Sequence, residues 1–242
     1  DSGSYLYNAP RPWSDRFTST AAHNTVQLGG QDQMLKVHRF TWAYLARARV
    51  IRFQARLAEN VDCFEGEHYG YRRLASRATH RRTVVRLGDS LWLVIDDILG
   101  RGREQVRLFW HLLDVPFTAD TRGVRLSTPM GPVSIAMHVP GGGGTLRVAR
   151  GEEGDEPMGW ESLHYRERRP APTACFDLGQ PELPQRILTL VSLGGAATWQ
   201  LDSPMAGLRL SEPGGAAWTL RLAPPGPERL PVLSEVVGET AG

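Results

Sequence analysis

Cysteine and long apolar runs are scarce in this sequence. It contains two cysteines, Cys63 and Cys175, which excludes a disulfide-dense scaffold. Neither lies in a Cys-x-x-Cys motif of the kind that binds zinc, and whether the two pair with each other is left open. No segment approaches the roughly 18 consecutive apolar residues of a membrane-spanning helix, so no membrane span is expected.

Lysine is almost absent, and basic charge is carried by arginine. Lys36 is the one lysine among 28 basic residues, which together with 26 acidic residues give a net charge of +2. The two signs are mixed along the chain, and without a block of like charge we expect no nucleic-acid partner. Arginine pairs well with carboxylates and sulfates, so the composition is compatible with an acidic partner.

Glycine and proline, by contrast, punctuate the sequence at short intervals. The 26 glycines and 17 prolines separate short runs of β-branched and aromatic residues, several of which alternate between polar and apolar positions. Many short strands at near-regular spacing are typical of all-β proteins. We therefore predict a large antiparallel β-sandwich with two or more stacked sheets and little helix. The clearest runs are residues 25–28, 47–57, 82–87, 91–95, 106–112, 133–138 and 186–193.

The predicted domain organisation is simple. All-β domains often reach 242 residues, so residues 1–242 are expected to form a single domain. Residues 91–95 are apolar throughout, which favours a central strand buried on both faces. The adjacent Asp96 and Asp97 would then face opposite sides, which argues against a hydrolase with paired carboxylates. Residues 224–242 form a proline-rich tail that either packs as an extended segment or frays.

A dense polar cluster lies near the start of the sequence, between Arg16 and Gln33. His23 and Asn24 stand where a loop enters an apolar strand, and loops on rigid scaffolds often carry function. Taken alone, a His-Asn pair is more often a hydrogen-bonding corner than a catalytic pair. Its interpretation therefore depends on the motifs around it.

Short motifs accompany this cluster along much of the chain. They are Asp1-Ser-Gly-Ser-Tyr5, Arg16-Phe-Thr-Ser-Thr20, His23-Asn-Thr-Val26, Gln31-Asp-Gln33, His68-Tyr-Gly-Tyr71, His80-Arg81, Val94-Ile-Asp-Asp-Ile98 with Gly100, and Trp160-Glu-Ser162 with Tyr165 and Pro170. Together they resemble the heparinase II/III-like family of polysaccharide lyases over about residues 1–175. The His-Asn-Thr and Asp-Gln pieces, with the upstream Asp-x-Gly-x-Tyr, are the most specific part of the resemblance.

The resemblance implies both a fold and a function. Members of that family have an N-terminal α/α toroid followed by a β-sandwich domain, and they cleave uronic-acid polysaccharides by β-elimination. This sequence would then be the C-terminal β-sandwich portion, with an acidic polysaccharide as substrate and the toroid, absent here, as its partner. Alone, such a chain is expected to be inactive, and the protein is expected to be periplasmic or secreted. A noncatalytic carbohydrate-binding or structural sandwich is the alternative interpretation.

The chemistry of β-elimination explains why a histidine is useful. A base removes the proton at C5 of the uronate, and an acid protonates the departing O4 oxygen. Donors that neutralise the uronate carboxylate stabilise the negative charge that develops beside it. The resemblance assigns His23 as base or neutraliser, with Asn24 shaping the loop, donating a hydrogen bond or serving as a purely structural residue. In the family, the acid is a tyrosine of the toroid.

Further candidate site residues follow from side-chain chemistry. Arginine pairs with uronate carboxylates and tryptophan stacks on sugar rings, which makes Arg11, Trp13 and Arg16 candidate glycan contacts. Gln33 and Tyr71 are two more. A packed tryptophan is the ordinary alternative for Trp13.

A structural metal ion is also implied by the resemblance. Some relatives hold one in this domain through two histidines and an aspartate, which makes His68 a candidate ligand for zinc or calcium, with His23 as the second histidine. The sequence offers Thr41 near the place where the aspartate is expected. Tight metal binding would compete with a role of His23 as a free base, so these two assignments exclude each other.

Overall fold

The structure is a computed structural model that describes residues 1–201, 207–212, 215–226 and 232–239. Its helices are short: α1 (Trp13–Arg16) and two 3-10 turns, η1 (Thr20–Ala22) and η2 (Gly70–Arg73). The remaining regular elements of the described chain are strands, which confirms the all-β prediction.

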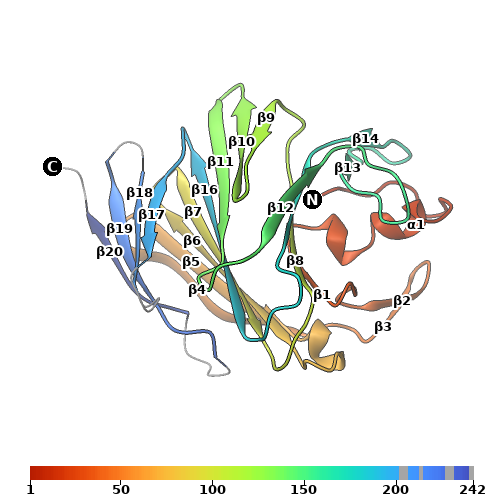
Figure 1. Ribbon diagram of the computed structural model, residues 1–242, viewed down its shortest axis with the longest axis horizontal. Helices are drawn as coiled ribbons and strands as arrows, with labels where there is room; N and C mark the ends of the chain where they lie inside the picture. The colour runs from red at the N-terminus through yellow and green to blue at the C-terminus, as the bar shows by residue number, and fades with distance from the viewer. Residues whose placement is uncertain (202–206, 213–214, 227–231, 240–242) are drawn as a thin grey trace.

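An eight-stranded antiparallel sheet forms the middle of the molecule (Figure 1). Its strands are, in spatial order, β4 (Ala48–Ala58), β5 (Val61–His68), β6 (Thr79–Leu87), β7 (Leu91–Leu99), β16 (Gln185–Leu193), β11 (Gly131–His138), β10 (Gly123–Thr128) and β9 (Phe117–Ala119). Neighbours in this sheet follow one another in the sequence except at β16, which lies between β7 and β11. The pairing of β16 with β7, which joins the two halves of the sheet, is therefore between strands that are distant in the sequence.

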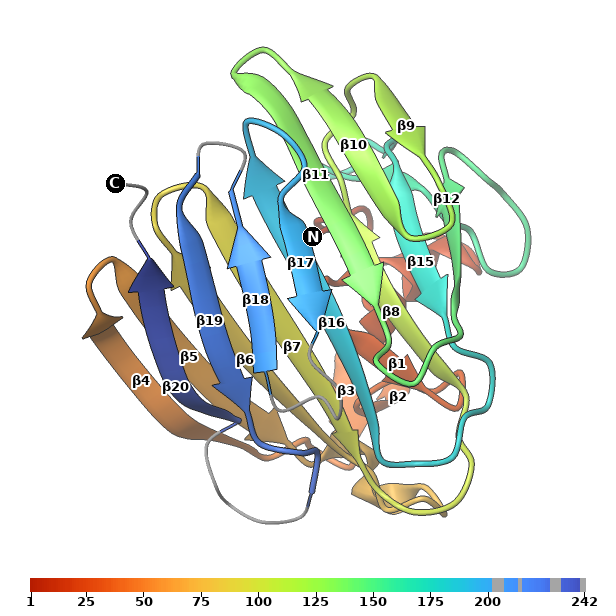
Figure 2. The same cartoon turned by 60° about the vertical axis from the view of Figure 1, so that its left-hand side comes forward.

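Two four-stranded sheets cover the two faces of this central sheet, which gives three layers (Figures 1 and 2). One consists of β1 (Val26–Leu28), β8 (Val106–His111), β15 (Thr173–Asp177) and β12 (Thr145–Ala149). The other consists of β17 (Thr198–Leu201), β18 (Gly207–Ser211), β19 (Ala217–Leu222) and β20 (Leu233–Glu239). Two small hairpins, β2 (Leu35–His38) with β3 (Thr41–Ala43) and β13 (Trp160–Glu161) with β14 (Arg169–Pro170), lie beside the first of these sheets.

Two hydrophobic cores fill the spaces between the layers, and β7 contributes to both. Leu91, Leu93 and Ile95 pack with residues of β18 and β19, whereas Ile98 packs with residues of β1, β8 and β15. The strand predicted to be buried on both faces therefore occupies the middle of a three-layered molecule. Period-two alternation assigns successive side chains of β7 to opposite cores.

The proline-rich tail contains a strand, β20. β20 pairs with β19 at the edge of its sheet, while residues 227–231 and 240–242 lie outside the described part of the chain. Cys63 and Cys175 are buried free thiols on β5 and β15, so they do not pair with each other. No helix of the described residues is long and apolar enough to cross a membrane.

Candidate active site

His23 stands at the entrance to an edge strand. It is the residue that ends η1, and β1 begins three residues later at the edge of the sheet β1-β8-β15-β12. The Nδ1 atom of its ring lies 2.6 Å from Oδ2 of Asp1, and 48% of its side chain is exposed. The structure thus gives His23 a carboxylate partner and leaves the ring accessible to a substrate.

The Asp-x-Gly motif explains how Asp1 reaches His23. Oδ1 of Asp1 accepts a hydrogen bond from the backbone N–H of Gly3 at 2.9 Å, which leaves Oδ2 for the histidine. Gly3 has a φ of +75° and forms a bridge with Ser162, and a Cβ atom at this position would lie 2.1 Å from the Ser162 carbonyl oxygen. Only glycine fits both the backbone conformation and this close approach.

The contact with Asp1 selects a tautomer of His23. A carboxylate accepts only, so Nδ1 carries the hydrogen and Nε2 carries the free lone pair. Burial lowers the pKa of His23 below its usual value, and the positive charge of Arg16 acts in the same direction. The ring is therefore neutral at pH 7, with Nε2 able to accept a proton.

Asn24 fixes the loop that carries His23. Its side-chain Oδ1 accepts the backbone N–H of His111 at 2.6 Å, and its backbone carbonyl accepts a hydrogen bond from the Arg82 guanidinium. The ring of His111 in turn contacts the Ala21 carbonyl at 3.0 Å through Nε2 and the Thr173 hydroxyl at 3.1 Å through Nδ1. Of the roles considered for Asn24, these contacts support the structural one.

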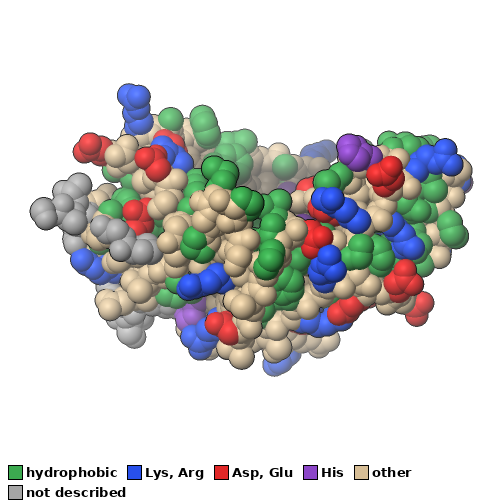
Figure 3. All heavy atoms as spheres, turned by 90° about the horizontal axis from the view of Figure 1, so that it is seen from above, with side chains coloured by type: hydrophobic (Ala, Val, Ile, Leu, Met, Phe, Trp, Pro, Cys, Tyr) green, Lys and Arg blue, Asp and Glu red, His purple; other side chains and the backbone are tan. Residues whose placement is uncertain are grey.

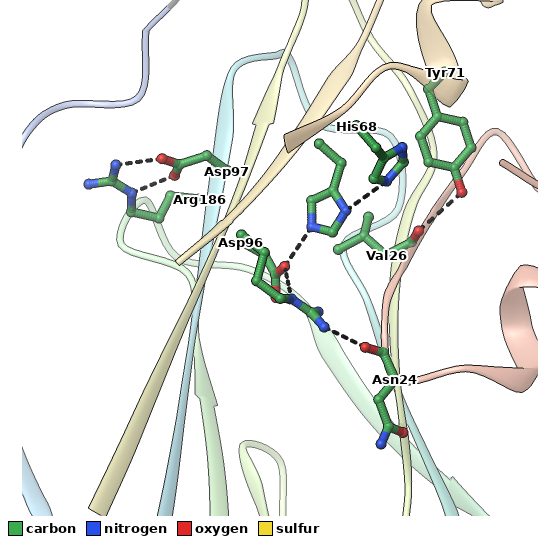
Figure 4. A network of polar contacts seen from close by, with 9 residues as sticks. Asn24, Val26, His68, Tyr71, Asp96, Asp97 and Arg186 are labelled. Atoms are coloured by element: carbon green, nitrogen blue, oxygen red, sulfur yellow. Dashed lines mark hydrogen bonds and ion pairs between the residues drawn. The ribbon is translucent and has the colours of Figure 1, made fainter. Parts of the chain in front are cut away.

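A row of hydrogen-bonded side chains on the central sheet ends at the backbone carbonyl of Asn24 (Figure 4). Nε2 of His68 lies 3.1 Å from Nδ1 of His80, and Nε2 of His80 lies 2.6 Å from Oδ1 of Asp96. Arg82 donates to both oxygens of Asp96, at 2.7 and 3.0 Å, and its remaining nitrogen reaches the Asn24 carbonyl. The row therefore connects β5, β6 and β7 to the loop of His23.

The hydrogen bonds of this row have one consistent direction. The backbone N–H of Gly70 donates to Nδ1 of His68, so His68 donates through Nε2 to His80, which donates to Asp96. Burial alone would raise the pKa of Asp96, but Arg82 and His80 outweigh burial and lower it to about 2. On the other face of β7, Asp97 pairs with Arg186 at 2.6 and 2.8 Å, as the alternation of a strand predicts.

The surroundings of His68 do not fit a metal site. Both of its ring nitrogens already hydrogen-bond within the protein. Within the described ranges, no three His, Cys, Asp or Glu side chains are grouped so that they could hold a metal ion. The expected role of His68 as a zinc or calcium ligand is therefore replaced by a role in the polar row.

Tyr71 also differs from its expected role. Its side chain is fully buried in the core beneath β1, and its hydroxyl donates to the Val26 carbonyl at 3.0 Å. Burial raises its pKa, so the hydroxyl stays protonated. A side chain with no exposed surface cannot contact a glycan in this structure, which corrects the expectation for Tyr71.

Trp13 is a packed aromatic residue, the alternative considered for it. Its ring meets Trp160 edge to face at a centroid distance of 5.3 Å, and the Arg168 guanidinium lies 3.5 Å from its centroid. Gln33 contributes its backbone: its N–H donates to the Thr20 hydroxyl at 2.9 Å.

Arg11 and Arg16 both line a cleft of about 870 Å³ next to the His23 loop. The cleft lies between the α1–η1 segment and the side of the sheet β1-β8-β15-β12 that faces away from the central sheet, and Ala21 is on its wall. Arg11 is exposed and pairs with Asp15 at 3.1 Å, whereas Arg16 is buried. The structure thus brings two of the predicted glycan contacts to one concave surface near His23.

Asp1, Asp32 and Arg82 are parts of the site to which the sequence reasoning gave no role. Asp32 accepts the backbone N–H of Thr20 at 2.6 Å, which ties the loop after β1 to η1. Asp1 and Asp32 lie inside the motifs of residues 1–5 and 31–33, so membership of these motifs was the feature of the sequence that could have pointed to them. Arg82 stands next to the His-Arg motif, but its contact with residue 24 is long-range.

Comparison with known proteins decides the family. The sequence matches the model of a family described as heparinase II/III-like, C-terminal, over residues 1–231. The chain belongs to this family. A search of curated proteins finds no match.

Solved structures share the fold of this heparinase II/III-like domain. One is a heparan sulfate lyase, HepC from Pedobacter heparinus, with 18% identity and a TM-score of 0.69 over 93% of this chain and 34% of that one. Another is a heparinase III, the BT4657 gene product, with 17% identity and a TM-score of 0.69 over 91% and 33%. The domain therefore spans about a third of the length of these proteins.

Proposed function

We propose that this domain is the C-terminal part of a lyase that cleaves an acidic polysaccharide by β-elimination, with His23 as the base. The observation that carries the proposal is the contact between His23 and Asp1, which leaves a neutral imidazole with a free lone pair on an accessible loop. Membership of the family supports the reaction class.

The roles of the groups follow from the reaction. Nε2 of His23 takes the C5 proton of the uronate, and the Asp1 carboxylate stabilises the imidazolium that forms. The acid that protonates the leaving O4 oxygen comes from outside this chain, from a tyrosine of an α/α toroid. Because the base must be neutral, turnover rises with pH through the pKa of His23, which burial places below its usual value.

The substrate and the location are part of the same proposal. The substrate is a polysaccharide that contains uronic acid, and the protein works in the periplasm or outside the cell, where such polymers occur. Arg11 and Gln33 remain candidate glycan contacts, because Arg11 is exposed at the cleft and Gln33 is partly exposed in the loop beside it.

The test uses the complete polypeptide that carries this domain. It is incubated with a panel of uronate polysaccharides, and the ultraviolet absorbance of the unsaturated uronate product is followed. We expect His23→Ala to reduce kcat at least about 100-fold, the usual contribution of a general base. Asp1→Asn should reduce kcat less and move the acid limb of the pH profile to lower pH, because the imidazolium loses its carboxylate partner.

A matched control is His38→Ala, which removes an exposed histidine of β2 and should leave turnover unchanged. Equal turnover of wild type and His23→Ala would contradict the proposal. That result, with glycan binding retained, would instead identify the domain as the noncatalytic carbohydrate-binding module considered above.

A further inference from the structure

Arg16 is a buried cation with no hydrogen-bond partner among the described residues. Its residue is 7% exposed, and none of its three side-chain nitrogens makes a hydrogen bond within the described chain. Burial lowers its pKa to about 10, which still leaves the guanidinium charged at pH 7. An unpaired buried charge is strongly unfavourable, so a fold that keeps one is expected to use it.

The position of Arg16 indicates what that use is. The residue lines the cleft of about 870 Å³, together with Ala21, two residues before His23. Its charge is close enough to lower the pKa of both His23 and His111. A group bound to Arg16 would therefore lie beside the proposed catalytic histidine.

The other arginines of the cleft already have partners. Arg107 donates to Gln27 at 2.7 Å, Arg147 pairs with Glu152, and Arg11 pairs with Asp15. Among the cleft arginines that the structure describes, Arg16 is thus the one whose guanidinium makes no hydrogen bond through any of its three nitrogens.

None of the acidic side chains that line the cleft hydrogen-bonds to the guanidinium of Arg16; they are Asp15, Asp32, Asp155, Glu156 and Asp177. Asp32 accepts the Thr20 N–H, and Asp177 accepts the Gly179 N–H at 2.7 Å. Burial alone accounts for the lowered pKa of Arg16, and no described carboxylate raises it. On the face seen from above, acidic and basic side chains are interspersed without a broad patch of either sign (Figure 3).

We infer that Arg16 is the receptor for one oxyanion of the glycan, a uronate carboxylate or a sulfate ester, bound in this cleft. The planar guanidinium offers five donors in a fork that matches either group bidentately. The identity of the ligand as a glycan rests on the proposed function, whereas the anion chemistry rests on Arg16 itself. Because the guanidinium is covered in the free protein, we expect the α1 segment to shift when the anion binds.

The first test is the stability of the free protein. Arg16→Met, made in the complete polypeptide, removes an unpaired buried charge and keeps an apolar stem of similar length. We expect its Tm to rise by about 2–4 °C, because the desolvation penalty disappears. Arg150→Met is the matched control: Arg150 is exposed, pairs with Asp114 at 2.8 Å and lies outside the cleft, so its Tm should hardly change. A fall in Tm of Arg16→Met would overturn the inference, since it would show that Arg16 has a partner within the protein.

The second test is binding, measured by titration calorimetry with His23→Ala protein so that no probe is cleaved. The probes are an unsulfated glucuronate tetrasaccharide, its sulfated counterpart and a neutral tetrasaccharide. We expect Arg16→Met to weaken binding of an acidic probe about 10- to 100-fold and Arg150→Met to leave it unchanged. If Arg16→Met binds both acidic probes more weakly, Arg16 binds the uronate carboxylate. If it binds only the sulfated probe more weakly, Arg16 binds the sulfate.

The two proposals fail separately. If Arg16→Met binds both acidic probes as tightly as the parent protein, the inference is wrong even if His23→Ala abolishes turnover. If His23→Ala keeps full turnover while binding depends on Arg16, the proposed base is wrong and the anion site stands.

Discussion

At the scale of single residues, the two polar groups of Asn24 are used in different ways. Its Oδ1 accepts the His111 N–H, and its backbone carbonyl accepts from Arg82. Only the first contact depends on the side chain. This difference allows a structural role to be separated from a catalytic one by substitution.

We expect Asn24→Asp to keep turnover within a few fold of wild type, because a carboxylate still accepts the His111 N–H. Asn24→Ala should lower the free energy of unfolding by about 1–3 kcal/mol, since it leaves a partly buried N–H without an acceptor. Urea unfolding and product absorbance measure the two effects. A complete loss of turnover in Asn24→Asp, with unchanged stability, would show that the amide donates to substrate.

The sequence predicted the important residue types better than it predicted their partners. The motif predicted His23 as a site residue, whereas the contact between Asp1 and His23 forms only because the turn at Gly3 brings Asp1 back onto the histidine. Tyr71 lies in a recognised motif too, yet its side chain faces the core. A motif in a single sequence does not say which side of the backbone faces solvent, because that depends on packing against β1.

At the scale of elements, the polar row across β5, β6 and β7 makes the sheet sensitive to acid. Burial, reinforced by His80 and Arg82, lowers the pKa of His68 to about 3, and burial likewise lowers that of His111 to about 3. Both pKa values in the unfolded chain are about 6.5. Folded-state pKa values below the unfolded ones mean that the unfolded chain takes up extra protons as pH falls below 6.5.

We therefore expect the free energy of unfolding to fall between pH 6.5 and pH 3, and His68 and His111 together contribute up to about 2.7 kcal/mol per pH unit to this fall. Asp96, with its pKa lowered to about 2, adds a further loss between about pH 4 and pH 2. Urea midpoints at pH 7, 5.5 and 4.5 measure the slope. His68→Gln should reduce the slope by up to about 1.4 kcal/mol per pH unit, and a midpoint that stays constant over this range would contradict the assignment.

The elements themselves were largely predictable, whereas their layering was not. The apolar run of residues 91–95 indicated a strand buried on both faces, and β7 is that strand. Nothing local in the sequence indicated that β16 pairs with β7, because that register is set by two cores that form only when distant segments meet. The same reasoning explains why the contact between Arg82 and residue 24 could not be foreseen.

At the scale of the whole molecule, the two cysteines report on different layers. Cys63 lies in the core between the central sheet and the sheet β17–β20. Cys175 lies on the opposite outer side of the molecule, in a small cluster with Phe109 and Met158. Burial raises the pKa of both thiols to about 11, which keeps them protonated and unreactive.

We expect Ellman's reagent to label neither thiol in the native protein at pH 8 and both in guanidinium chloride. At intermediate denaturant concentration, Cys175→Ser leaves Cys63 as the probe of the interface between the central sheet and the sheet β17–β20. Cys63→Ser leaves Cys175 as the probe of the packing of Ala21 and Met158 over the outer face of the other sheet. Rapid labelling of either single-cysteine variant under native conditions would show that the packing over that thiol opens freely.

The insertion of β16 between β7 and β11 also dictates the order in which the chain is completed during synthesis. Within the central sheet, β4 to β7 emerge first, and β7 ends at Leu99, but its second partner begins only at Gln185. At ribosomal rates the free edge of β7, an apolar strand, waits on the order of 10 s for that partner. An unpaired apolar edge is a template for aggregation, so we expect the nascent chain to be most prone to aggregate in this interval, before residue 193 has left the ribosome.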